Sequence, residues 1–194
     1  MAVKVAIGLG NSGSQYEGTR HNAGMQAMAR IAALYGAEFA QNKYCAAYLA
    51  KAAVAGRGVV FAAAMGYMNE SGVNIANILR YLKADISEAV VFYDDITLPR
   101  GGFKLSEGGS AGGHNGVANI MERCGNSFAR IRIGLGGKPI KEMDLADYVL
   151  GRFSEEERAA FEASIPEMKA AFETVCAKGL AAAQNIFNRS RREF

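Results

Sequence analysis

The chain has 194 residues, half of them hydrophobic, and it carries a formal net charge of +3. This length and apolar content suit one domain with a substantial core and exclude a disordered chain, while the mildly basic charge permits a nucleic-acid partner without requiring one. No basic segment followed by a long apolar stretch opens the chain, and no apolar run approaches the ~20 residues that cross a bilayer, so we expect neither a signal peptide nor a membrane helix. The three cysteines, Cys45, Cys124 and Cys176, are odd in number and form no C-x-x-C motif, which is typical of reduced side chains in a cytoplasmic protein.

The first half of the chain alternates predicted strands and helices. Apolar residues alternate over VKVAIGL, recur at helical spacing in two later segments, and form two strand-like runs that meet at a glycine-rich turn. In chain order we predict a strand over 3–9, a helix over 21–36, a hairpin over 44–65 that turns at 56–58, a helix over 71–84 and a buried strand over 89–93. The last of these strands ends at Asp94 and Asp95.

The second half begins with a helix that the sequence GGHNGVANIMERCG introduces and that Gly125 closes. Basic and apolar residues alternate over 130–136, which predicts a strand that is half exposed or lies at an edge of the sheet, and a turn-rich loop follows. Ser154 and Glu157 form a capping box. The capping box predicts the start of a helical C-terminal region, which we expect Pro166 to interrupt.

This alternation predicts an α/β fold, a single domain over 1–194 with a central mixed β-sheet flanked by helices. In open α/β sheets, ligands bind at the carboxyl ends of the strands. Polar residues follow several of the predicted strands, and one pair opens a helix: Asn11, Asn69, Asp94, His114 and Asn115. We therefore expect the functional site at this edge of the sheet.

Residues 8–24, GLGNSGSQYEGTRHNAG, contain the G-x-G-x-x-G spacing of a dinucleotide-binding turn. Such a turn needs a helix that starts at once and an acidic residue about 20 positions further on, at the end of a second strand. Here the helical pattern begins only near His21, and the nearest later acid, Glu38, ends no strand. A loop that merely turns the chain would explain Gly10 and Gly13 but not the polar side chains between them, so we expect a ligand pocket rather than a cofactor cradle.

His21 and His114 are the two histidines of the chain, so any mechanism that needs an imidazole must use one of them. Asp94 could hydrogen-bond such a ring and stabilise its protonated form, or it could cap the strand and face solvent. The histidines and aspartates match no metal-binding motif, and no G-x-S-x-G nucleophile elbow is present. Attack by a water that His21 activates as a general base is the simplest chemistry.

Amide and apolar side chains supply candidates for substrate binding. Asn69 and Asn115 can each donate and accept, which suits recognition of a peptide bond. Tyr67 and Met68 could line a pocket or belong to the core. His114 could cap the helix that follows it.

Three cations lie near a glycine-rich segment, 108–116. Lys104, Arg130 and Arg132 are individually typical of solvated surface charges. Together with the glycine-rich segment they could form a path for phosphate groups.

Several segments in combination resemble bacterial peptidyl-tRNA hydrolase. They are GLGNSGSQYEGTRHNAG at 8–24, MGYMNESG at 65–72, YDDITLPRG at 93–101, GSAGGHNG at 109–116, RIRIGLG at 130–136 and YVLGRFS at 148–154. The resemblance implies a single α/β domain with no metal and no cofactor. It also implies a monomer that cleaves the ester between peptide and tRNA and so recycles tRNA for translation.

The resemblance also implies residue roles. His21 would be the general base, Asp94 would orient and stabilise it, and Asn11 would place the substrate and separate N-blocked from free aminoacyl groups. The residues implied to line the site for the peptide and the CCA end are Tyr16, Tyr67, Met68, Asn69, His114 and Asn115. Lys104 and Arg132 would contact phosphates of the acceptor stem.

The chain departs from the residues that are usual in this family at four positions. Ser12 stands in place of a proline, Tyr93 in place of a histidine, Thr97 where an acid is common and Ser106 where a basic residue sometimes occurs. The histidine–aspartate pair is unaffected, but the rigidity of the first loop and the contacts with tRNA depend on these residues.

Two functions of other classes remain open. One is a non-catalytic RNA-binding module in which the same loops hold a CCA end, and the other is an NAD-dependent oxidoreductase built on the glycine turn. The sequence assigns no role to the basic tail, Arg189, Arg191 and Arg192, and it does not establish whether 136–154 closes over a substrate.

Overall fold

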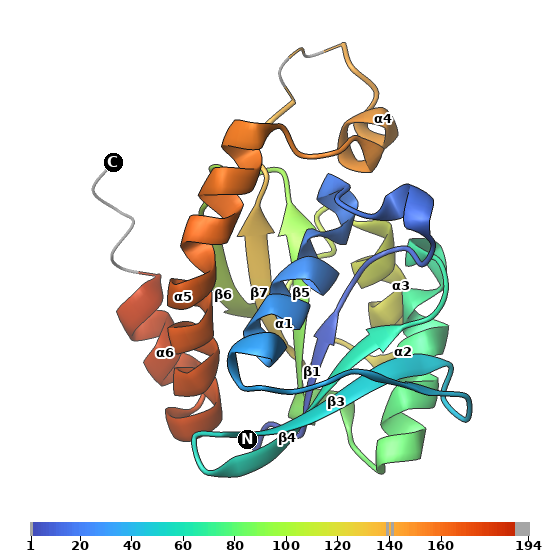
Figure 1. The fold of residues 1–194 in the computed structure, drawn as a ribbon, viewed down its shortest axis with the longest axis vertical. Coiled ribbons are helices and arrows are strands. Elements are labelled where there is room, and N and C mark those ends of the chain that lie inside the picture. Colours follow the sequence, from blue (N-terminus) through green and yellow to red (C-terminus); the bar gives the residue numbers. More distant parts are fainter. Residues whose placement is uncertain (1, 139, 141, 189–194) are drawn as a thin grey trace.

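The computed structural model describes residues 2–138, 140 and 142–188, so the basic tail lies outside the described residues. Within this part, seven strands form one sheet in the order β2-β3-β4-β1-β5-β7-β6 (Figure 1). The strands are β1 Val5–Gly8, β2 Ala40–Asn42, β3 Ala47–Val54, β4 Arg57–Ala64, β5 Ala89–Asp95, β6 Phe103–Glu107 and β7 Ala129–Gly134.

The sheet is mixed. β1 pairs in parallel with β4 and β5, and β5 pairs in parallel with β7. The pairs β2/β3, β3/β4 and β6/β7 are antiparallel. The carboxyl ends of the four parallel strands therefore meet at one edge of the sheet, which faces α4 in Figure 1.

Helices cover both faces of the sheet. The α-helices are α1 Ala23–Leu34, α2 Ser71–Leu82, α3 Asn115–Cys124, α4 Leu145–Leu150, α5 Glu155–Lys178 and α6 Leu180–Phe187. Short 3-10 turns are η1 Ser14–Tyr16, η2 Arg20–Asn22, η3 Met68–Glu70 and η4 Ile86–Glu88. One core cluster joins α1, α5 and α6 to the sheet, and a second joins α2 and α3 to the other face. The predicted α/β fold with a mixed sheet is confirmed.

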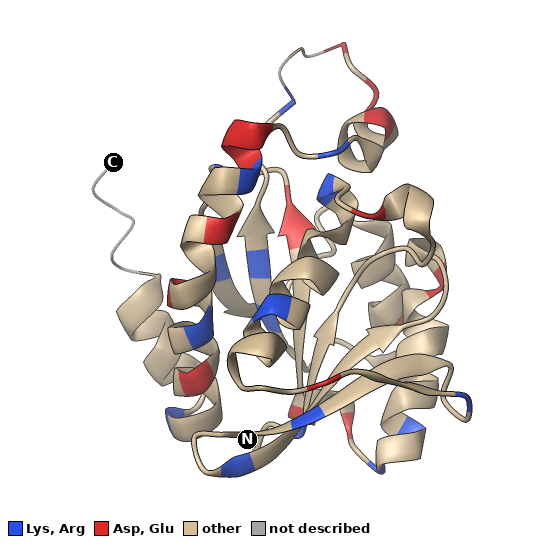
Figure 2. Cartoon of the chain, viewed as in Figure 1, with Lys and Arg blue, Asp and Glu red and all other residues tan. Residues whose placement is uncertain are grey.

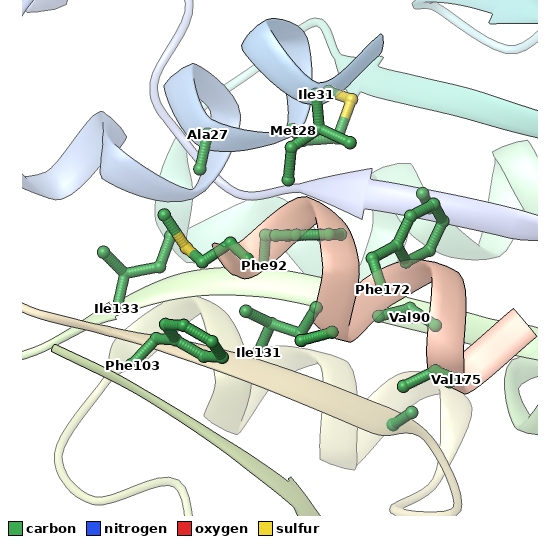
Figure 3. Packing of buried hydrophobic residues seen from close by; sticks show 14 of the residues in the cluster. Ala27, Met28, Ile31, Val90, Phe92, Phe103, Ile131, Ile133, Phe172 and Val175 are labelled. Atoms are coloured by element: carbon green, nitrogen blue, oxygen red, sulfur yellow. The ribbon is translucent and has the colours of Figure 1, made fainter. Parts of the chain in front are cut away.

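The first core brings α1 and α5 together over the middle of the sheet. Figure 3 shows Met28 and Ile31 of α1 above Phe92 of β5, with Phe172 of α5 beside Phe92. α1 can approach β5 this closely because residue 24 is glycine: a Cβ there would lie 2.1 Å from the carbonyl oxygen of Phe92. This close approach brings the start of α1 to the carboxyl end of β5.

Most predicted elements form near the expected boundaries. The hairpin turn lies at Ala55 and Gly56, both with positive φ, and so it comes earlier than expected, because Arg57 already pairs with Val54 across the hairpin. The sequence patterns gave no indication of β2, β6 or α4. Within the described residues, none of the helices combines the length and apolarity that a bilayer crossing requires.

Two expectations are wrong. The strand over 130–136, β7, is not at an edge: it lies between β5 and β6, and the Arg130 side chain is buried. Pro166 does not interrupt the C-terminal helix, because α5 runs through it and ends only before Gly179. A proline inside a helix costs about 3 kcal/mol. The buried side chains on both sides of it, Ile165 and Met168 among them, offset that cost by packing in the core.

Candidate active site

Two imidazoles contact one buried carboxylate at the carboxyl end of β5. His21 Nδ1 lies 3.0 and 3.1 Å from the two carboxylate oxygens of Asp94, and His114 Nε2 lies 3.0 Å from Asp94 Oδ1. Only 5% of the Asp94 surface is exposed. The alternative that Asp94 caps the strand and faces solvent is therefore wrong, because its carboxylate is buried and hydrogen-bonded to the two histidines.

The chain places His21 beside Asp94 through η2, the 3-10 turn that precedes α1. The next residue, Asn22, is buried and bonds the loop after β1: its Oδ1 accepts from the Asn11 amide at 2.8 Å, and its Nδ2 donates to the Asn11 carbonyl at 2.9 Å. The turn is thus tied to β1 on one side and faces β5 on the other. Within the described residues, His21 Nε2 has no hydrogen-bond partner.

His114 is held from both ring nitrogens. It is the N-cap residue of α3, and its Nδ1 accepts a hydrogen bond from the Val117 amide at 3.2 Å. Because Nδ1 is an acceptor, the proton of the neutral ring lies on Nε2, which donates to Asp94. The capping interpretation of His114 is thus confirmed, and the same ring also supports the carboxylate.

The charge of Asp94 is stabilised despite its burial. Burial raises the pKa of this carboxyl, but the electrostatic interaction and the hydrogen bond with His114, followed by the hydrogen bond and the electrostatic interaction with His21, more than offset burial and lower the pKa from 3.8 to about 2. The carboxylate is therefore ionised at neutral pH. An ionised carboxylate beside one imidazole nitrogen can stabilise the positive charge of a ring that is protonated at the other nitrogen.

A cleft of about 730 Å³ opens in front of this cluster. Seven of the predicted site residues line it: His21, Met68, Asn69, Asp94, His114, Asn115 and Arg132. The rest of its lining comes mainly from the ends of β5 and β6, the glycine-rich loop Gly108–Gly113 and α4. The part of the lining that β5 supplies lies where the carboxyl ends of the parallel strands meet, as the sequence predicts, whereas Ser106 and Glu107 of antiparallel β6 extend the cleft toward the amino end of β7.

Four predicted site residues do not line the cleft. Asn11 lies behind it, where its Oδ1 accepts from the Met68 amide at 2.7 Å. Tyr16 and Tyr67 contact each other edge to face at 6.4 Å. Lys104 is exposed on β6, in register with Arg132 of β7.

The two arginines of β7 differ from the expectation of solvated charges. Arg130 is 2% exposed, and its guanidinium donates to the Ser110 carbonyl at 2.9 Å and to Asn126 Oδ1, so it holds the glycine-rich loop. Arg132 forms an ion pair with Asp95, with its Nε 2.7 Å from Oδ2. In Figure 2 the acidic end of β5 lies beside basic positions of β7. Any phosphate that binds Arg132 must share this guanidinium with Asp95.

The departures from the resemblance have structural counterparts. Ser12 donates its amide to the Gly66 carbonyl at 2.9 Å, a bond that a proline cannot make, and its Oγ accepts from the Gly66 amide at 2.9 Å. Tyr93 packs edge to face on His114 with ring centroids 5.1 Å apart. Thr97 donates its amide and hydroxyl to Asp95 Oδ1. Ser106 lines the cleft.

Sequence patterns missed the wall that α4 provides. Leu145, Ala146, Val149 and Leu150 line the cleft, yet they follow a segment that the sequence predicts as a loop. Asp144 caps α4 by accepting from the amides of Ala146 and Asp147, a signal that could have located the helix.

Among the described residues, His21, Asp94 and His114 are the single group of three or more potential ligands close enough to share a metal ion, with ligand atoms within 4.8 Å of one another. The ring of His114 does not fit that use as it stands, because its Nδ1 accepts from Val117 and its Nε2 carries a proton toward Asp94. The contacts of this group are those of a hydrogen-bonded network.

Comparison with known proteins identifies the family to which this chain belongs. A family model described as peptidyl-tRNA hydrolase matches residues 5–193. The chain is 40% identical over 186 residues to peptidyl-tRNA hydrolase of Lachnoclostridium phytofermentans, covering 95% of this chain and 96% of that one. It is 38% identical over 185 residues to the Bacillus subtilis protein of the same name, covering 95% and 97%.

A solved structure agrees with these relatives. The crystal structure of peptidyl-tRNA hydrolase from Acinetobacter baumannii matches with a TM-score of 0.89 and 28% sequence identity, over 96% of this chain and 95% of that one. The resemblance seen in the sequence motifs is thus supported over nearly the whole chain. The chain belongs to the peptidyl-tRNA hydrolase family.

Proposed function

We propose that this protein hydrolyses the ester bond of peptidyl-tRNA by a water molecule that His21 activates, with Asp94 supporting the charge that forms on the imidazole. One observation carries the assignment of the base. His21 Nδ1 bonds the buried Asp94 carboxylate, whereas its Nε2 has no partner among the described residues and the ring lines the cleft. This is the arrangement of an imidazole that is oriented through one nitrogen and can accept a proton at the other.

The contacts of His114 support the choice of His21. A proton on His114 Nδ1 would break the hydrogen bond from the Val117 amide and remove the cap of α3. His114 therefore serves better as a neutral donor that fixes Asp94 than as a base. His21 can accept a proton at Nε2 without losing any contact within the described residues.

The reaction proceeds in two steps. His21 Nε2 takes a proton from water as the water oxygen bonds the ester carbonyl carbon, and the carbonyl oxygen becomes an oxyanion. The bond from that carbon to the ribose oxygen then breaks, and the ribose oxygen receives the proton that His21 holds. The products are a peptide with a free carboxyl group and a tRNA with a free ribose hydroxyl.

Amide side chains are suited to hold the acylated end of the substrate. Asn69 and Asn115 line the cleft and are exposed, so their amides can meet a peptide bond or the oxyanion. Asn11 Nδ2 has no acceptor among the described residues, while its Oδ1 is fixed by Met68. Asn11 could therefore donate to a substrate carbonyl. A site built to pair with a peptide bond disfavours a free charged amine, because its polar groups would then be left unpaired.

The tRNA side of the proposal rests on aromatic and basic residues around the cleft. Tyr16 and Tyr67 present an edge-to-face pair near the Asn11 loop, which suits stacking with the unpaired CCA end. Lys104 and Arg132, in register on β6 and β7, are suited to acceptor-stem phosphates. Arg132 would exchange part of its ion pair with Asp95 for a phosphate.

We further propose that 1–194 acts as one catalytic domain and as a monomer in the cytoplasm, without a metal or an organic cofactor. A single sheet runs through the described part of the chain, and both of its faces are packed by helices of the same chain. The cytoplasm is where tRNA and the ribosome meet.

One assay tests the proposal against its alternatives. The protein is incubated with N-acetylated aminoacyl-tRNA, with free aminoacyl-tRNA and with buffer, in the presence of a chelator and without any added cofactor. We expect deacylation of the N-acetylated substrate alone. Binding of tRNA without ester cleavage would identify an RNA-binding module instead, and a requirement for nicotinamide cofactor would favour an oxidoreductase. Loss of cleavage on chelation would contradict the metal-independent mechanism.

A further inference from the structure

We infer that Arg20 and Glu157 form a positioning pair, which fixes the turn carrying His21 against the α4 wall of the cleft. The inference rests on the proposed function, since it assumes that His21 is the base. It gives a second role to Glu157, which the sequence marks only as part of a helix cap. Neither residue lines the cleft, so both act through the residues that they hold.

The two side chains meet in a mostly buried, two-pronged ion pair. Arg20 Nη2 lies 2.7 Å from Glu157 Oε2, and Arg20 Nε lies 3.2 Å from Oε1. The exposed fractions of the two side chains are 15% and 5%. Burial would raise the pKa of the Glu157 carboxyl, but the hydrogen bonds from Arg20 and the Ser154 amide lower it, so this carboxylate is ionised at neutral pH. A planar guanidinium with two bonds to one carboxylate restricts position and orientation together.

The same guanidinium also binds α4. Arg20 Nη1 donates to the Tyr148 carbonyl at 3.1 Å, and the guanidinium carbon lies 4.6 Å from the centre of the Tyr148 ring. The Arg20 amide donates to the Gly151 carbonyl at 2.9 Å. Residue 151 is tightly packed here, because a Cβ on it would lie 2.7 Å from Arg20 Nη1. One side chain thus joins η2, α4 and the start of α5.

These contacts connect the proposed base to the α4 wall of the cleft. Arg20 directly precedes His21 in η2, and Tyr148 lies between the α4 residues that line the cleft. Tyr148 is in turn fixed to the sheet, since its hydroxyl donates to the Leu135 carbonyl at 3.0 Å. The distance between His21 and the α4 wall therefore depends on the Arg20 side chain and on the carboxylate that orients it.

The helix cap does not by itself require a charge at residue 157. In the capping box, Glu157 Oε2 accepts from the Ser154 amide at 2.8 Å, and Ser154 Oγ accepts from the Glu157 amide at 3.2 Å. Glutamine serves in a capping box as well as glutamate does. A Glu157→Gln variant consequently keeps the cap and removes the ionic part of the contact with Arg20, together with the longer ion pair of 3.5 Å between Glu157 Oε1 and Arg100 Nε.

The chain contains a matched control pair. Arg30 of α1 bonds Glu162 of α5 through Nε at 2.6 and 2.8 Å, and its guanidinium lies 5.5 Å from the Phe161 ring centre. Both side chains are more exposed, at 37% and 42%, and neither residue lines the cleft. This pair resembles the first in chemistry and in the helix it reaches, but it contacts neither η2 nor α4 within the described residues.

The test compares the variants Glu157→Gln, Glu162→Gln and Ser154→Ala. Thermal unfolding is measured for each variant, and kcat and KM are then measured well below its unfolding temperature. We expect kcat of Glu157→Gln to fall roughly tenfold to a hundredfold, because small displacements of a catalytic group have effects of this size. Glu162→Gln should stay within about twofold of the wild type, and Ser154→Ala should lose thermal stability with kcat unchanged. Equal kcat values in Glu157→Gln and Glu162→Gln would overturn the inference.

A second readout does not depend on activity. The chain has two histidines, so 15N-histidine labelling gives spectra of two imidazoles, which the spectrum of His21→Ala assigns. We expect Glu157→Gln to shift or broaden the His21 signals and leave those of His114 in place, with no change in Glu162→Gln. Unchanged His21 signals would contradict the inference. Shifted signals in a protein that cleaves no ester would instead contradict the proposed function while the positioning pair stands.

If Glu157→Gln does not fold, a more conservative substitution at the other residue of the pair tests the inference. Arg20→Lys retains the charge but not the forked geometry, with Arg30→Lys as its control. We expect a fall in kcat of several fold in the first and none in the second. Equal activity of these two variants would overturn the inference as well.

Discussion

The two turns that bring histidines to Asp94 differ in how much freedom they leave to the ring. η2 holds His21 through its backbone and through Asn22, so the ring bonds the carboxylate with Nδ1 and keeps Nε2 unpartnered among the described residues. The start of α3 holds His114 through the ring itself, because both nitrogens are occupied, one by Val117 and one by Asp94. The two histidines therefore lie at the same distance from one carboxylate but differ in their capacity to take up a proton.

This difference teaches that contact with a carboxylate does not identify a catalytic base. Whether an imidazole can act as a base depends on whether its other ring nitrogen is free to accept a proton. At His114 that nitrogen already completes a helix cap. We therefore expect the two histidines to respond differently to substitution, and the following experiments would break or sharpen the comparison.

Replacement of His21 by alanine should have the largest effect. General acid–base catalysis contributes about 10²–10⁴-fold to enzymatic rates, so we expect kcat for N-acetylated aminoacyl-tRNA to fall by roughly three orders of magnitude. The fold should persist, because the ring is partly exposed and the turn is held by its neighbours. Steady-state kinetics with a circular dichroism control would measure this, and near-normal turnover would remove His21 as the base.

Asp94→Asn should have the next largest effect. The neutral amide retains the shape of the carboxylate but cannot stabilise an imidazolium, so kcat should fall about 10²-fold and KM should change little. Measuring kcat and KM separately distinguishes this from a binding role. A defect confined to KM would show that Asp94 acts in binding rather than in the proton transfer.

Acid should destabilise the protein through the same residue. The pKa of Asp94 is lowered from 3.8 to about 2, so its contribution is present above pH 4 and is lost as the pH falls from about 4 to about 2. The shift corresponds to about 2 kcal/mol of unfolding free energy. Denaturant unfolding at a series of pH values should give a curve that falls less steeply for Asp94→Asn than for the wild type. Parallel curves would contradict the link between this carboxylate and acid stability.

At His114, two substitutions should separate the cap from the contact with Asp94. Asparagine is among the best N-cap residues, so His114→Asn should keep the cap of α3 while it loses the contact with Asp94 and kcat falls about tenfold. His114→Ala should lose roughly 1 kcal/mol in addition, because the cap is gone. If both variants lost as much activity as His21→Ala, the two rings would be catalytically equivalent and the comparison would fail.

The smallest effect is expected at the proposed phosphate contacts. Each phosphate contact contributes about 0.7–0.9 to the slope of log K against log salt concentration. Lys104→Ala and Arg132→Ala should each reduce that slope by this amount in tRNA-binding titrations, whereas substitution of an exposed lysine of β3, Lys51→Ala, should not. An unchanged slope in the first two variants would show that neither residue contacts phosphate.

Much of the site could be predicted from short-range patterns. Apolar alternation located β1 and a short apolar run located β5, and the polar residues after them fell at the edge where parallel strands end. That reasoning brought Asp94 and His21 to one neighbourhood, and the distance of 3.0 Å between them agrees with it. The capping box at Ser154 located the start of α5 because both of its hydrogen bonds are made within four residues.

Sequence patterns gave wrong predictions for residues whose surroundings are formed by a distant part of the chain. Arg130 alternates with apolar residues as an exposed residue would, but the loop carbonyls at 109 and 110 and the Asn126 side chain replace water around its guanidinium. Pro166 breaks helices in isolation, but here α5 lies on the sheet core on both sides of it. Local propensity is a weak term beside such packing.

The sequence by itself determined the α/β fold, the family, and the edge of the sheet where histidine, aspartate and asparagine side chains gather, because strand and helix periodicity and capping act over a few residues. Only the tertiary structure decided which ring nitrogen has no partner among the described residues, that Arg132 is paired with Asp95, and that Glu157 binds Arg20 across 137 residues of sequence. Hydrogen bonds between distant segments depend on how helices and loops pack on the sheet, and no local sequence pattern determines which distant segments meet.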